Sequence, residues 1–244
     1  MNALTPSTSP FAGLRVAITG GTSGLGRALV EQLHAQGAHV AFVARDAPRV
    51  DALARSLPGT HGIVGDIADK AQTHRIALQI NALLGGLDVL VNNASSLGPV
   101  PLALLADTEC EDFEAALATN LVGPFRLTKA LLGALTAAAR DGAPHGRASV
   151  VVNIGSDAAT TPYAGWGAYG ASKAALVHLS RIWNEELAEH GVRMLSIDPG
   201  DMDTPLHALA LPDADPAALK RPRDAARDVI AAIASALVAT GAVA

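Results

Sequence analysis

The stretch from Ser156 to Lys173 holds three residue types that together can move a proton to or from an oxygen. If the chain is helical from about Ala168, Tyr169 and Lys173 stand at positions i and i+4 and share one face of the helix. A tyrosine hydroxyl has an ordinary pKa of about 10, and a neighbouring ammonium group favours the phenolate and lowers that pKa. Ser156, at the expected end of the preceding strand, can donate a hydrogen bond to the same substrate oxygen. The three residues predict acid–base chemistry at an oxygen that changes between carbonyl and alcohol.

The Tyr-Lys pair alone is also compatible with chance, so the rest of the chain must be considered. The sequence has 244 residues, 50% of them hydrophobic and 17% charged, which predicts one large domain with a well-buried core. A net charge of −5 argues against a nucleic-acid partner. The single cysteine, Cys110, excludes an internal disulfide and fits a reducing, cytoplasmic location.

No targeting or membrane segment is predicted. No apolar run approaches the roughly 18 residues that a membrane-spanning helix needs. Residues 1–12 are rich in Ser, Thr and Pro, and we expect them to form a disordered tail rather than a signal peptide. Residues 13–244 are expected to form a single domain. No metal site is predicted.

A phosphate-binding turn is predicted near the start of this domain. Residues 14–19 read as a buried strand, residues 20–26 are rich in glycine, and an amphipathic helix follows to about Gln36. Glycines allow close backbone approach, and a helix N-terminus offers free N–H groups to an anion. An ordinary tight turn is the alternative. The spacing Thr-Gly-x-x-x-Gly-x-Gly differs from the common Gly-x-Gly-x-x-Gly of dinucleotide sites.

The end of the second expected strand bears on the choice of cofactor. Sites for NAD usually carry an acid there, but this strand ends at Ala44 and is followed by Arg45 and Arg49. A guanidinium group can pair with a 2′-phosphate in bidentate fashion, which favours NADP. Because Asp46 is an acid close to this strand end, NAD remains an alternative cofactor. Arg45 could equally be a solvated surface charge.

Two further polar positions end later strands. Asp66 can accept a hydrogen bond from an adenine amino group or, alternatively, cap the next helix. Asn92 and Asn93 can accept and donate backbone hydrogen bonds and hold the cofactor loop together.

Taken together, these motifs resemble the short-chain dehydrogenase/reductase family from Phe11 onward. The matches, in family order, are Thr19-Gly20-x-x-x-Gly24-x-Gly26, Asp66, Asn92-Asn93-Ala94, Asn120, Ser156, Tyr169-x-x-x-Lys173 and Pro199-Gly200. The resemblance implies an α/β fold: a Rossmann-type, doubly wound parallel sheet of six to seven strands with helices on both faces. It also implies hydride transfer between a nicotinamide and a carbonyl or alcohol, in a homodimer or homotetramer.

The resemblance assigns roles to individual residues. Tyr169 is the implied acid/base, Ser156 polarises the substrate oxygen, Lys173 holds the nicotinamide ribose and tunes Tyr169, and Asn120 supports a proton relay. The implied cofactor-binding residues are Gly20, Thr22, Ser23, Gly24, Leu25, Gly26, Arg45, Asp66, Ile67, Asn93, Ala94, Tyr169, Lys173, Pro199, Gly200, Met202 and Thr204.

Pro124 lies inside a helix that we expect over residues 108–140. Because proline has no N–H, it cannot donate to the carbonyl of Asn120, and its ring opens that turn. The freed carbonyl could hold a water that connects Lys173 to solvent. A kink that only wraps the helix around the core is the alternative.

The last part of the domain is expected to cover the substrate. Residues 201–222 contain four prolines and read as a lid with a short helix at about 206–210. A final helix is expected over residues 222–239. Only residues 241–244 remain for the seventh strand that the family usually has, which leaves that strand in doubt.

Short motifs also resemble the sepiapterin-reductase and benzil-reductase branch, which reduces compact ketones and diketones with NADPH. They are Asn93-Ala94-x-x-Leu97-Gly98, Gly165-Trp166 and Pro199-Gly200-x-x-Asp203-Thr204. The implied substrate-binding residues are Ser156, Tyr163, Trp166 and Asp203. Tyr163 and Trp166 could instead be packing residues, and Asp203 could cap the short helix.

Two functions remain open at this point. The first is an NADP-dependent carbonyl reductase, and the second is a catalytically silent NADP-binding sensor or regulatory protein. Fold alone does not separate them. The intact set of Asn120, Ser156, Tyr169 and Lys173 favours the enzyme.

Overall fold

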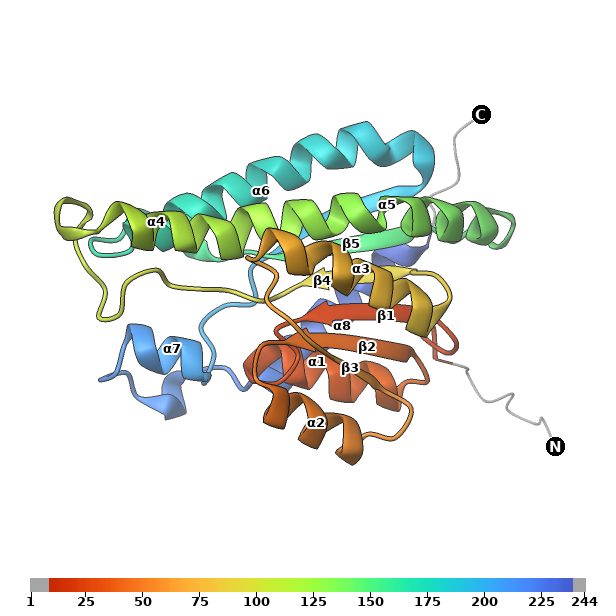
Figure 1. Ribbon diagram of the computed structural model, residues 1–244, viewed down its shortest axis with the longest axis horizontal. Coiled ribbons are helices and arrows are strands. Elements are labelled where there is room, and N and C mark those ends of the chain that lie inside the picture. Colours follow the sequence, from red (N-terminus) through yellow and green to blue (C-terminus); the bar gives the residue numbers. More distant parts are fainter. Residues whose placement is uncertain (1–8, 239–244) are drawn as a thin grey trace.

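Short apolar segments form a central parallel sheet in the computed structural model, which describes residues 9–238 (Figure 1). The strands are β1 (Arg15–Thr19), β2 (His39–Ala44), β3 (His61–Val64), β4 (Val89–Asn92), β5 (Ser149–Ile154) and β6 (Val192–Ile197). They form a six-stranded sheet in the order β3-β2-β1-β4-β5-β6, and every neighbouring pair is parallel. The strands are nearly continuous apolar runs because helices cover both faces of the sheet.

The helices occupy two layers. They are α1 (Gly24–Ala35), α2 (Ala47–Ser56), α3 (Lys70–Leu84), α4 (Cys110–Leu117), α5 (Gly123–Gly142), α6 (Gly167–Leu187), α7 (Pro205–Ala210) and α8 (Pro222–Leu237). Helices α1 and α8 pack together over one face of the sheet, and α3 and α5 pack together over the other, beside α6 (Figure 1). This is the doubly wound α/β fold that the sequence predicts.

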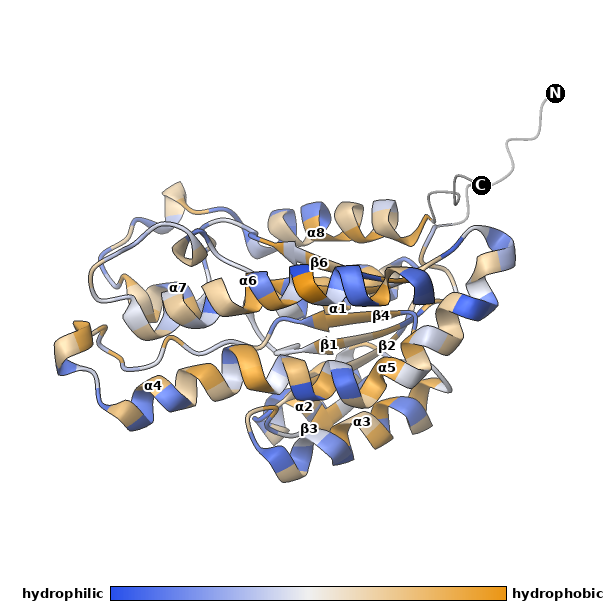
Figure 2. Ribbon diagram, turned by 90° about the horizontal axis from the view of Figure 1, so that it is seen from above, coloured by the Kyte–Doolittle hydropathy of each residue, from blue (hydrophilic) through white to orange (hydrophobic). Residues whose placement is uncertain are grey.

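The helix α5 shows how the sequence selects the buried face. Leu127, Leu131 and Leu135 recur every four residues, and all three are fully buried against the sheet. Each contributes on the order of 2 kcal/mol to stability through burial of its side chain. Figure 2 shows the same division across the molecule, with hydrophobic residues along the strands and hydrophilic stripes on the helices.

The order of the strands places a crevice at one edge of the sheet. β1 lies between β2 and β4, so the chain turns in opposite directions after β1 and after β4. In open α/β sheets ligands bind outside the carboxyl ends of the strands at this switch point. The glycine-rich turn, Arg45, Asp66, Asn93, Ser156 and Pro199-Gly200 all follow the carboxyl end of a strand.

The expected boundary of the N-terminal tail is wrong for residues 9–12. Phe11 is only 1% exposed and belongs to the core under α1, where its ring fills apolar space. The Gly13 N–H donates to the carbonyl of Gly37 over 2.9 Å, which ties this segment to the domain. Residues 1–8 lie outside the described range, as do residues 241–244, where a seventh strand was in doubt. Within residues 9–238, no helix has the length and apolar character needed to cross a membrane.

The helix expected over residues 108–140 is interrupted near Pro124. Helix α4 is followed by a π-helical turn, Ala118–Val122, and then by α5. The Gly123 N–H donates to the carbonyl of Ala118, five residues back. Since Pro124 has no N–H to donate to Asn120, the wider turn fits the sequence-based expectation of an opened helix at this point.

The segment expected to form a lid is anchored at both ends. Met202 and Lys220 form a parallel bridge, in which the Asp203 N–H donates to the carbonyl of Lys220 over 3.0 Å. The Lys220 N–H in turn donates to the carbonyl of Asp201 over 3.0 Å. Helix α7 stands between these anchors, away from the main helical layers (Figure 1).

Candidate active site

A cavity of about 1010 Å³ lies at the carboxyl edge of the sheet. Its wall contains nearly all of the predicted cofactor-binding residues: Gly20, Thr22, Ser23, Gly24, Leu25, Arg45, Asp66, Ile67, Asn93, Ala94, Tyr169, Lys173, Pro199, Gly200, Met202 and Thr204. Gly26 and Asn120 stand behind the wall. The strand ends therefore bring distant motifs into one site.

The glycine-rich turn after β1 exposes the N-terminus of α1. Gly20 and Gly24 have φ of +69° and +48°, which a residue with a side chain rarely adopts. Ser23 precedes the helix but makes no side-chain capping bond, and the first turn of α1 has no acidic residue. The free N–H groups and the positive end of the helix dipole therefore fit a diphosphate.

Gly26 lies behind the cavity wall, where it allows close packing. A Cβ atom there would stand 2.2 Å from the carbonyl oxygen of Gly20 and 2.4 Å from Nδ2 of Asn93. Asn93 Nδ2 donates to the carbonyls of Thr19 and Gly20 over 2.9 and 3.3 Å. These contacts confirm the prediction that Asn93 braces the cofactor loop.

Asn92 has a different place from the one predicted. Its Nδ2 points into the interior and donates to Asn153 Oδ1 over 2.8 Å and to Thr128 Oγ1 over 3.2 Å. Because side chains alternate along a strand, Asn92 and Asn93 cannot both face the cofactor loop. Asn92 links β4 to β5 and α5.

Two arginines line the far end of the cavity. Asp46 caps α2, since its Oδ1 accepts the Arg49 N–H over 3.0 Å, and its Oδ2 lies 3.4 Å from the Arg49 guanidinium. Arg45 is exposed and has no ion-pair partner among residues 9–238. An acid committed to a helix cap and a free guanidinium together suit a phosphorylated ribose better than a bare diol.

Asp66 also lines this end, and its alternative role as a helix cap is wrong. The cap of α3 is Asp69, whose Oδ1 accepts the Ala71 N–H over 2.8 Å. Asp66 instead closes a tight turn by accepting the Ala68 N–H over 2.9 Å. Asp66 also lines the cavity, where a carboxylate oxygen is suited to a nucleobase donor.

Helix α6 places Tyr169 and Lys173 on one buried face at the inner end of the cavity. The two residues are 8% and 2% exposed, and Lys173 Nζ lies 5.5 Å from the centre of the Tyr169 ring. Lys173 Nζ donates to the carbonyl of Ile154, at the end of β5, over 2.7 Å. Burial lowers the pKa of Lys173 to about 8, although Asp198 opposes this shift.

The pKa of Tyr169 is raised, not lowered as its neighbour Lys173 led us to expect. Burial is the main cause, because it penalises the phenolate. Hydrogen bonds from the hydroxyls of Ser156 and Ser95 act in the opposite direction and favour the phenolate. The proton on Tyr169 is therefore held at neutral pH, and hydroxyl groups are in place to stabilise the anion left when it departs.

Ser156 stands between Tyr169 and an acidic neighbour. Its Oγ donates to Asp157 Oδ1 over 3.1 Å and accepts the Ala158 N–H over 3.2 Å. Hydrogen bonds to Tyr163 and Ser156 lower the pKa of Asp157, so this carboxylate is charged at neutral pH. The hydroxyl of Ser156 is thus oriented by the turn that follows β5.

Asn120 holds the loop after β4 against α6. Its side chain, 1% exposed, donates from Nδ2 to Ser172 Oγ over 2.8 Å and to the Ser96 carbonyl over 2.7 Å. Its Oδ1 accepts from Ser95 Oγ over 3.1 Å and from the Ser96 N–H over 2.8 Å. The π-helical turn therefore places Asn120 as a support beneath Tyr169 rather than in the cavity wall.

The substrate end of the cavity is apolar. Leu97, Tyr169 and Ala210 form a small cluster, against which Trp166 and Leu206 pack. Trp166 meets the Tyr169 ring edge to face at 5.6 Å and also lines the cavity. Helix α7 closes this end.

The structure does not bring Tyr163 and Asp203 into the cavity wall. Tyr163 is 45% exposed, and its hydroxyl donates to Asp157 Oδ2 over 2.7 Å. Asp203 is exposed, and the cap of α7 is Thr204, whose Oγ1 accepts the His207 N–H over 3.2 Å. Neither proposed role of the Asp203 side chain, substrate contact or helix cap, has support in these positions.

Several wall residues escaped sequence reasoning: Ser95, Ser96, Asp157, Asp198, Asp201, Leu206, His207 and Leu209. The position of Ser95, directly after the motif that ends β4, was the one available signal. The residues of α7 gave no signal in the sequence, because a six-residue helix is too short to show a periodic pattern. No group of three His, Cys, Asp or Glu side chains that could bind a metal occurs within residues 9–238.

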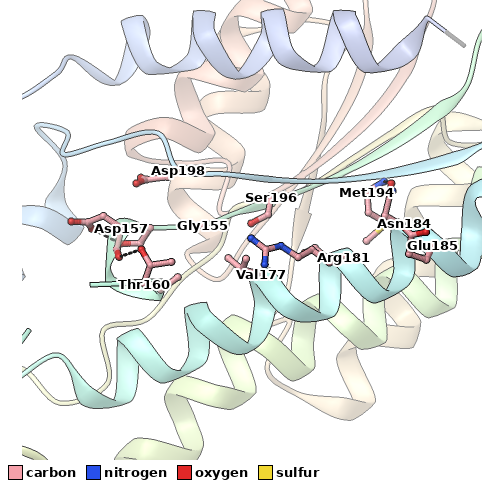
Figure 3. A pocket seen from close by; sticks show the side chains of 13 residues that line it. Gly155, Asp157, Thr160, Val177, Arg181, Asn184, Glu185, Met194, Ser196 and Asp198 are labelled. Atoms are coloured by element: carbon pink, nitrogen blue, oxygen red, sulfur yellow. Dashed lines mark hydrogen bonds between the residues drawn. The ribbon is translucent and has the colours of Figure 1, made fainter. Parts of the chain in front are cut away.

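A second hollow of about 400 Å³ lies between α6 and β6 (Figure 3). It shares Gly155, Ser156, Asp157 and Asp198 with the main cavity. Arg181 and Glu185 of α6 and Ser196 of β6 form its outer part. None of the acid–base residues other than Ser156 reaches it.

Comparisons with known proteins agree with this geometry. Residues 15–214 match the protein family described as short chain dehydrogenase. Serine 3-dehydrogenase of Agrobacterium fabrum is 35% identical over 191 residues, which cover 78% of this chain and 72% of that protein. Carbonyl reductase [NADPH] 2 of Sus scrofa is 31% identical over 189 residues, or 78% of this chain and 72% of that protein.

Solved structures show the same fold. A short chain dehydrogenase from Burkholderia cenocepacia in complex with NADP superimposes with a TM-score of 0.79 at 27% identity, covering 92% of this chain and 91% of that one. The sequence match, the strand order and the arrangement of Ser156, Tyr169 and Lys173 lead to one conclusion: this chain belongs to the short-chain dehydrogenase family.

Proposed function

We propose that the protein is an NADPH-dependent carbonyl reductase that acts on compact, uncharged ketones. One observation carries the proposal: Tyr169 lines one cavity together with Ser156 and Lys173, and the same cavity reaches Arg45 at its far end. This arrangement joins a proton donor to a site for a phosphorylated dinucleotide.

Each side chain has a distinct task in the proposed reaction. A bound nicotinamide supplies the hydride. The Ser156 hydroxyl, which donates to Asp157 in this structure, turns to donate to the substrate carbonyl oxygen and holds that oxygen beside Tyr169. Tyr169 then gives its proton to the oxygen as negative charge develops there. Lys173, held by the Ile154 carbonyl, stabilises the phenolate that remains.

The adenosine end favours NADPH over NADH. Arg45 is free to pair with a 2′-phosphate, whereas the nearest acid, Asp46, is engaged with Arg49. Two relatives support this choice by what their names state: the Burkholderia structure is a complex with NADP, and the Sus scrofa enzyme is a carbonyl reductase that uses NADPH.

The substrate end favours neutral over anionic ketones. Its walls are the apolar side chains around Trp166 and Leu206, which suit a small aryl or alkyl ketone. The same cavity wall carries the carboxylates of Asp157, Asp198 and Asp201. A carboxylate on the substrate would be repelled by them.

The proposal is tested by following NADPH absorbance with a panel of benzil, aryl ketones and pterins. Methyl benzoylformate and benzoylformate form a matched pair, because they differ mainly in one negative charge. We expect turnover of neutral members and a kcat/KM at least about tenfold higher for the ester, as a repulsion of about 1.4 kcal/mol gives. Tight NADPH binding without turnover of any member would instead support a catalytically silent sensor, and a preference for the acid would overturn the substrate assignment.

A further inference from the structure

His207 is a nearly buried imidazole in the cavity wall, and the protein leaves its hydrogen-bonding capacity unused. Its side chain is 10% exposed. The charged group closest to the ring is Asp201, whose Oδ1 lies 3.9 Å from Nε2, beyond hydrogen-bonding distance. Within residues 9–238 the ring has no hydrogen-bond partner, although buried polar groups are seldom left without one. The partner must therefore come from a molecule that fills the cavity.

Helix α7 places this imidazole close to Tyr169. Leu206 and Ala210 stand at positions i and i+4 of the helix, and both pack in the cluster that contains Tyr169. His207 is three residues before Ala210 and therefore next to it on the helix surface. The ring thus lines the part of the cavity where a substrate in contact with Tyr169 lies.

The chemistry of the ring limits what it can bind. An imidazole carries at least one N–H in both its neutral and its protonated form, so in either form it can donate to an oxygen. In the proposed reaction the reacting carbonyl oxygen is already held by Ser156 and Tyr169. The acceptor for His207 is therefore a second oxygen on the substrate. The other residues that α7 contributes to the wall are apolar, namely Pro205, Leu206, Leu209 and Ala210.

We propose that His207 determines specificity by donating a hydrogen bond to a second, uncharged oxygen beside the reacting carbonyl of the substrate. The preferred class is then 1,2-diketones and α-keto esters rather than simple ketones. An anionic oxygen is disfavoured at the same place, because the Asp201 carboxylate stands 3.9 Å from the ring. The inference rests on the proposed reduction of a ketone at Tyr169 and narrows its substrate class. No bond of His207 is made or broken in the reaction.

The contact with Asp201 does not account for the position of His207. The Asp201 side chain is 76% exposed, and an ion pair with an exposed carboxylate at 3.9 Å contributes little to stability. The base of α7 is held instead by the backbone bridge between Met202 and Lys220 and by Thr204, whose Oγ1 accepts the His207 N–H. The side chain of His207 is therefore available to a ligand.

The kinetic test uses benzil and deoxybenzoin, a matched pair in which one carbonyl oxygen of benzil is replaced by two hydrogens. In His207→Leu, kcat/KM for benzil should fall about tenfold, mainly through a higher KM, because a contact to a non-reacting oxygen is lost. The value for deoxybenzoin should change less than about threefold, because it lacks that oxygen. Each substrate is compared between wild type and variant, so the greater intrinsic reactivity of benzil cancels.

Further variants separate recognition from packing. His207→Gln keeps an N–H donor and should retain kcat/KM for benzil within about threefold. Ala208→Leu places the same side chain at an exposed position of α7 outside the cavity wall and should behave as wild type. If His207→Leu does not fold, His207→Phe removes the same N–H and keeps a ring. Equal losses with both substrates would overturn the proposal and indicate a packing role, and so would an unchanged value for benzil.

A binding experiment distinguishes failure of this inference from failure of the proposed function. Benzil and deoxybenzoin are titrated into the protein saturated with NADP⁺, which cannot reduce a ketone, and tryptophan fluorescence reports occupancy of the cavity beside Trp166. The dissociation constant for benzil should rise about tenfold in His207→Leu, and that for deoxybenzoin should stay within about threefold.

Each outcome of the binding experiment has one meaning. Binding of benzil that depends on His207, without turnover, would refute the proposed function alone. Turnover of benzil with equal binding to the wild-type protein and to His207→Leu would refute the role of His207 alone. Failure of the wild-type protein to bind benzil would overturn the substrate class.

Discussion

At the scale of single residues, the site is built from groups that are costly to bury. Lys173 is 2% exposed, and its ammonium donates to the Ile154 carbonyl. Its pKa is lowered to about 8, so the folded state binds this proton less tightly than the unfolded chain does. Burial of the Lys173 ammonium beside Tyr169 therefore lowers the stability of the folded protein.

Lys173→Met should therefore stabilise the protein without cofactor while abolishing turnover. Below pH 8 the buried charge costs about 3 kcal/mol, and loss of the bond to Ile154 offsets about 1 of these, so a gain of about 2 kcal/mol is expected. The gain should shrink above pH 8, where folded Lys173 loses its proton, and vanish near the ordinary lysine pKa. Thermal unfolding from pH 6 to 10 measures this, with exposed Lys70→Met as the control. A lower melting temperature at pH 7 would contradict the account.

Arg45 should control the choice of cofactor. In Arg45→Asp the charge that faces the 2′-phosphate is reversed, so kcat/KM for NADPH should fall about 100-fold, while that for NADH changes less than about threefold. Arg55→Asp, in the last turn of the following helix α2 and outside the cavity wall, is the matched control. Equal losses with both cofactors would indicate a packing role for Arg45 instead.

At the scale of elements, the turn between β1 and α1 can form because glycines, which have no side chain, occupy its crowded positions. The sequence predicts this turn well, because a run of glycines between a strand and a helix has few other uses. It does not reveal which glycine contacts ligand and which allows packing. That distinction depends on the approach of Asn93 from the end of β4, which is far away in sequence.

Gly26→Ala and Gly133→Ala should have opposite effects on stability. At Gly26 a methyl group would meet the Gly20 carbonyl at 2.2 Å, so the turn must shift, at a cost of at least about 2 kcal/mol and with weaker NADPH binding. Gly133 lies inside α5, and apart from the helix's own backbone nothing lies within 4 Å of the added methyl, so a gain of about 0.5–1 kcal/mol is expected. Thermal unfolding and NADPH titration measure both variants. A harmless Gly26→Ala would show that the turn is not tightly packed.

The elements also show why some predictions failed. The strand expected over residues 14–19 forms as Arg15–Thr19, and the final helix expected over residues 222–239 forms as Pro222–Leu237, because long apolar or amphipathic segments give a strong signal. Phe11 was assigned to a tail, since a single aromatic residue among Ser and Pro gives no periodic signal. Tyr163 and Asp203 were assigned to the substrate by short motifs, and such motifs do not determine the direction of a side chain in a loop.

At the scale of the whole molecule, the parallel sheet brings the site residues together. Residues as far apart as Gly20 and Lys173 meet because every strand ends at the same edge, and this could be predicted from the strand–helix alternation alone. The support by Asn120 could not be derived in this way. It depends on a π-helical turn and on the orientation of one buried amide, both of which arise from three-dimensional packing.

The central claim is that Tyr169 delivers the proton, and Tyr169→Phe tests it most directly. The substitution removes the hydroxyl but keeps the ring against Trp166, so the fold and the dissociation constant for NADPH should stay nearly unchanged. The kcat for reduction of a ketone that the wild-type protein accepts should fall by about 100- to 10,000-fold, the usual contribution of a general acid. Tyr163→Phe, at the only other tyrosine, should keep a kcat of the wild-type order. If Tyr169→Phe keeps more than a few per cent of the wild-type kcat while binding NADPH normally, Tyr169 is not the proton donor and the account is wrong.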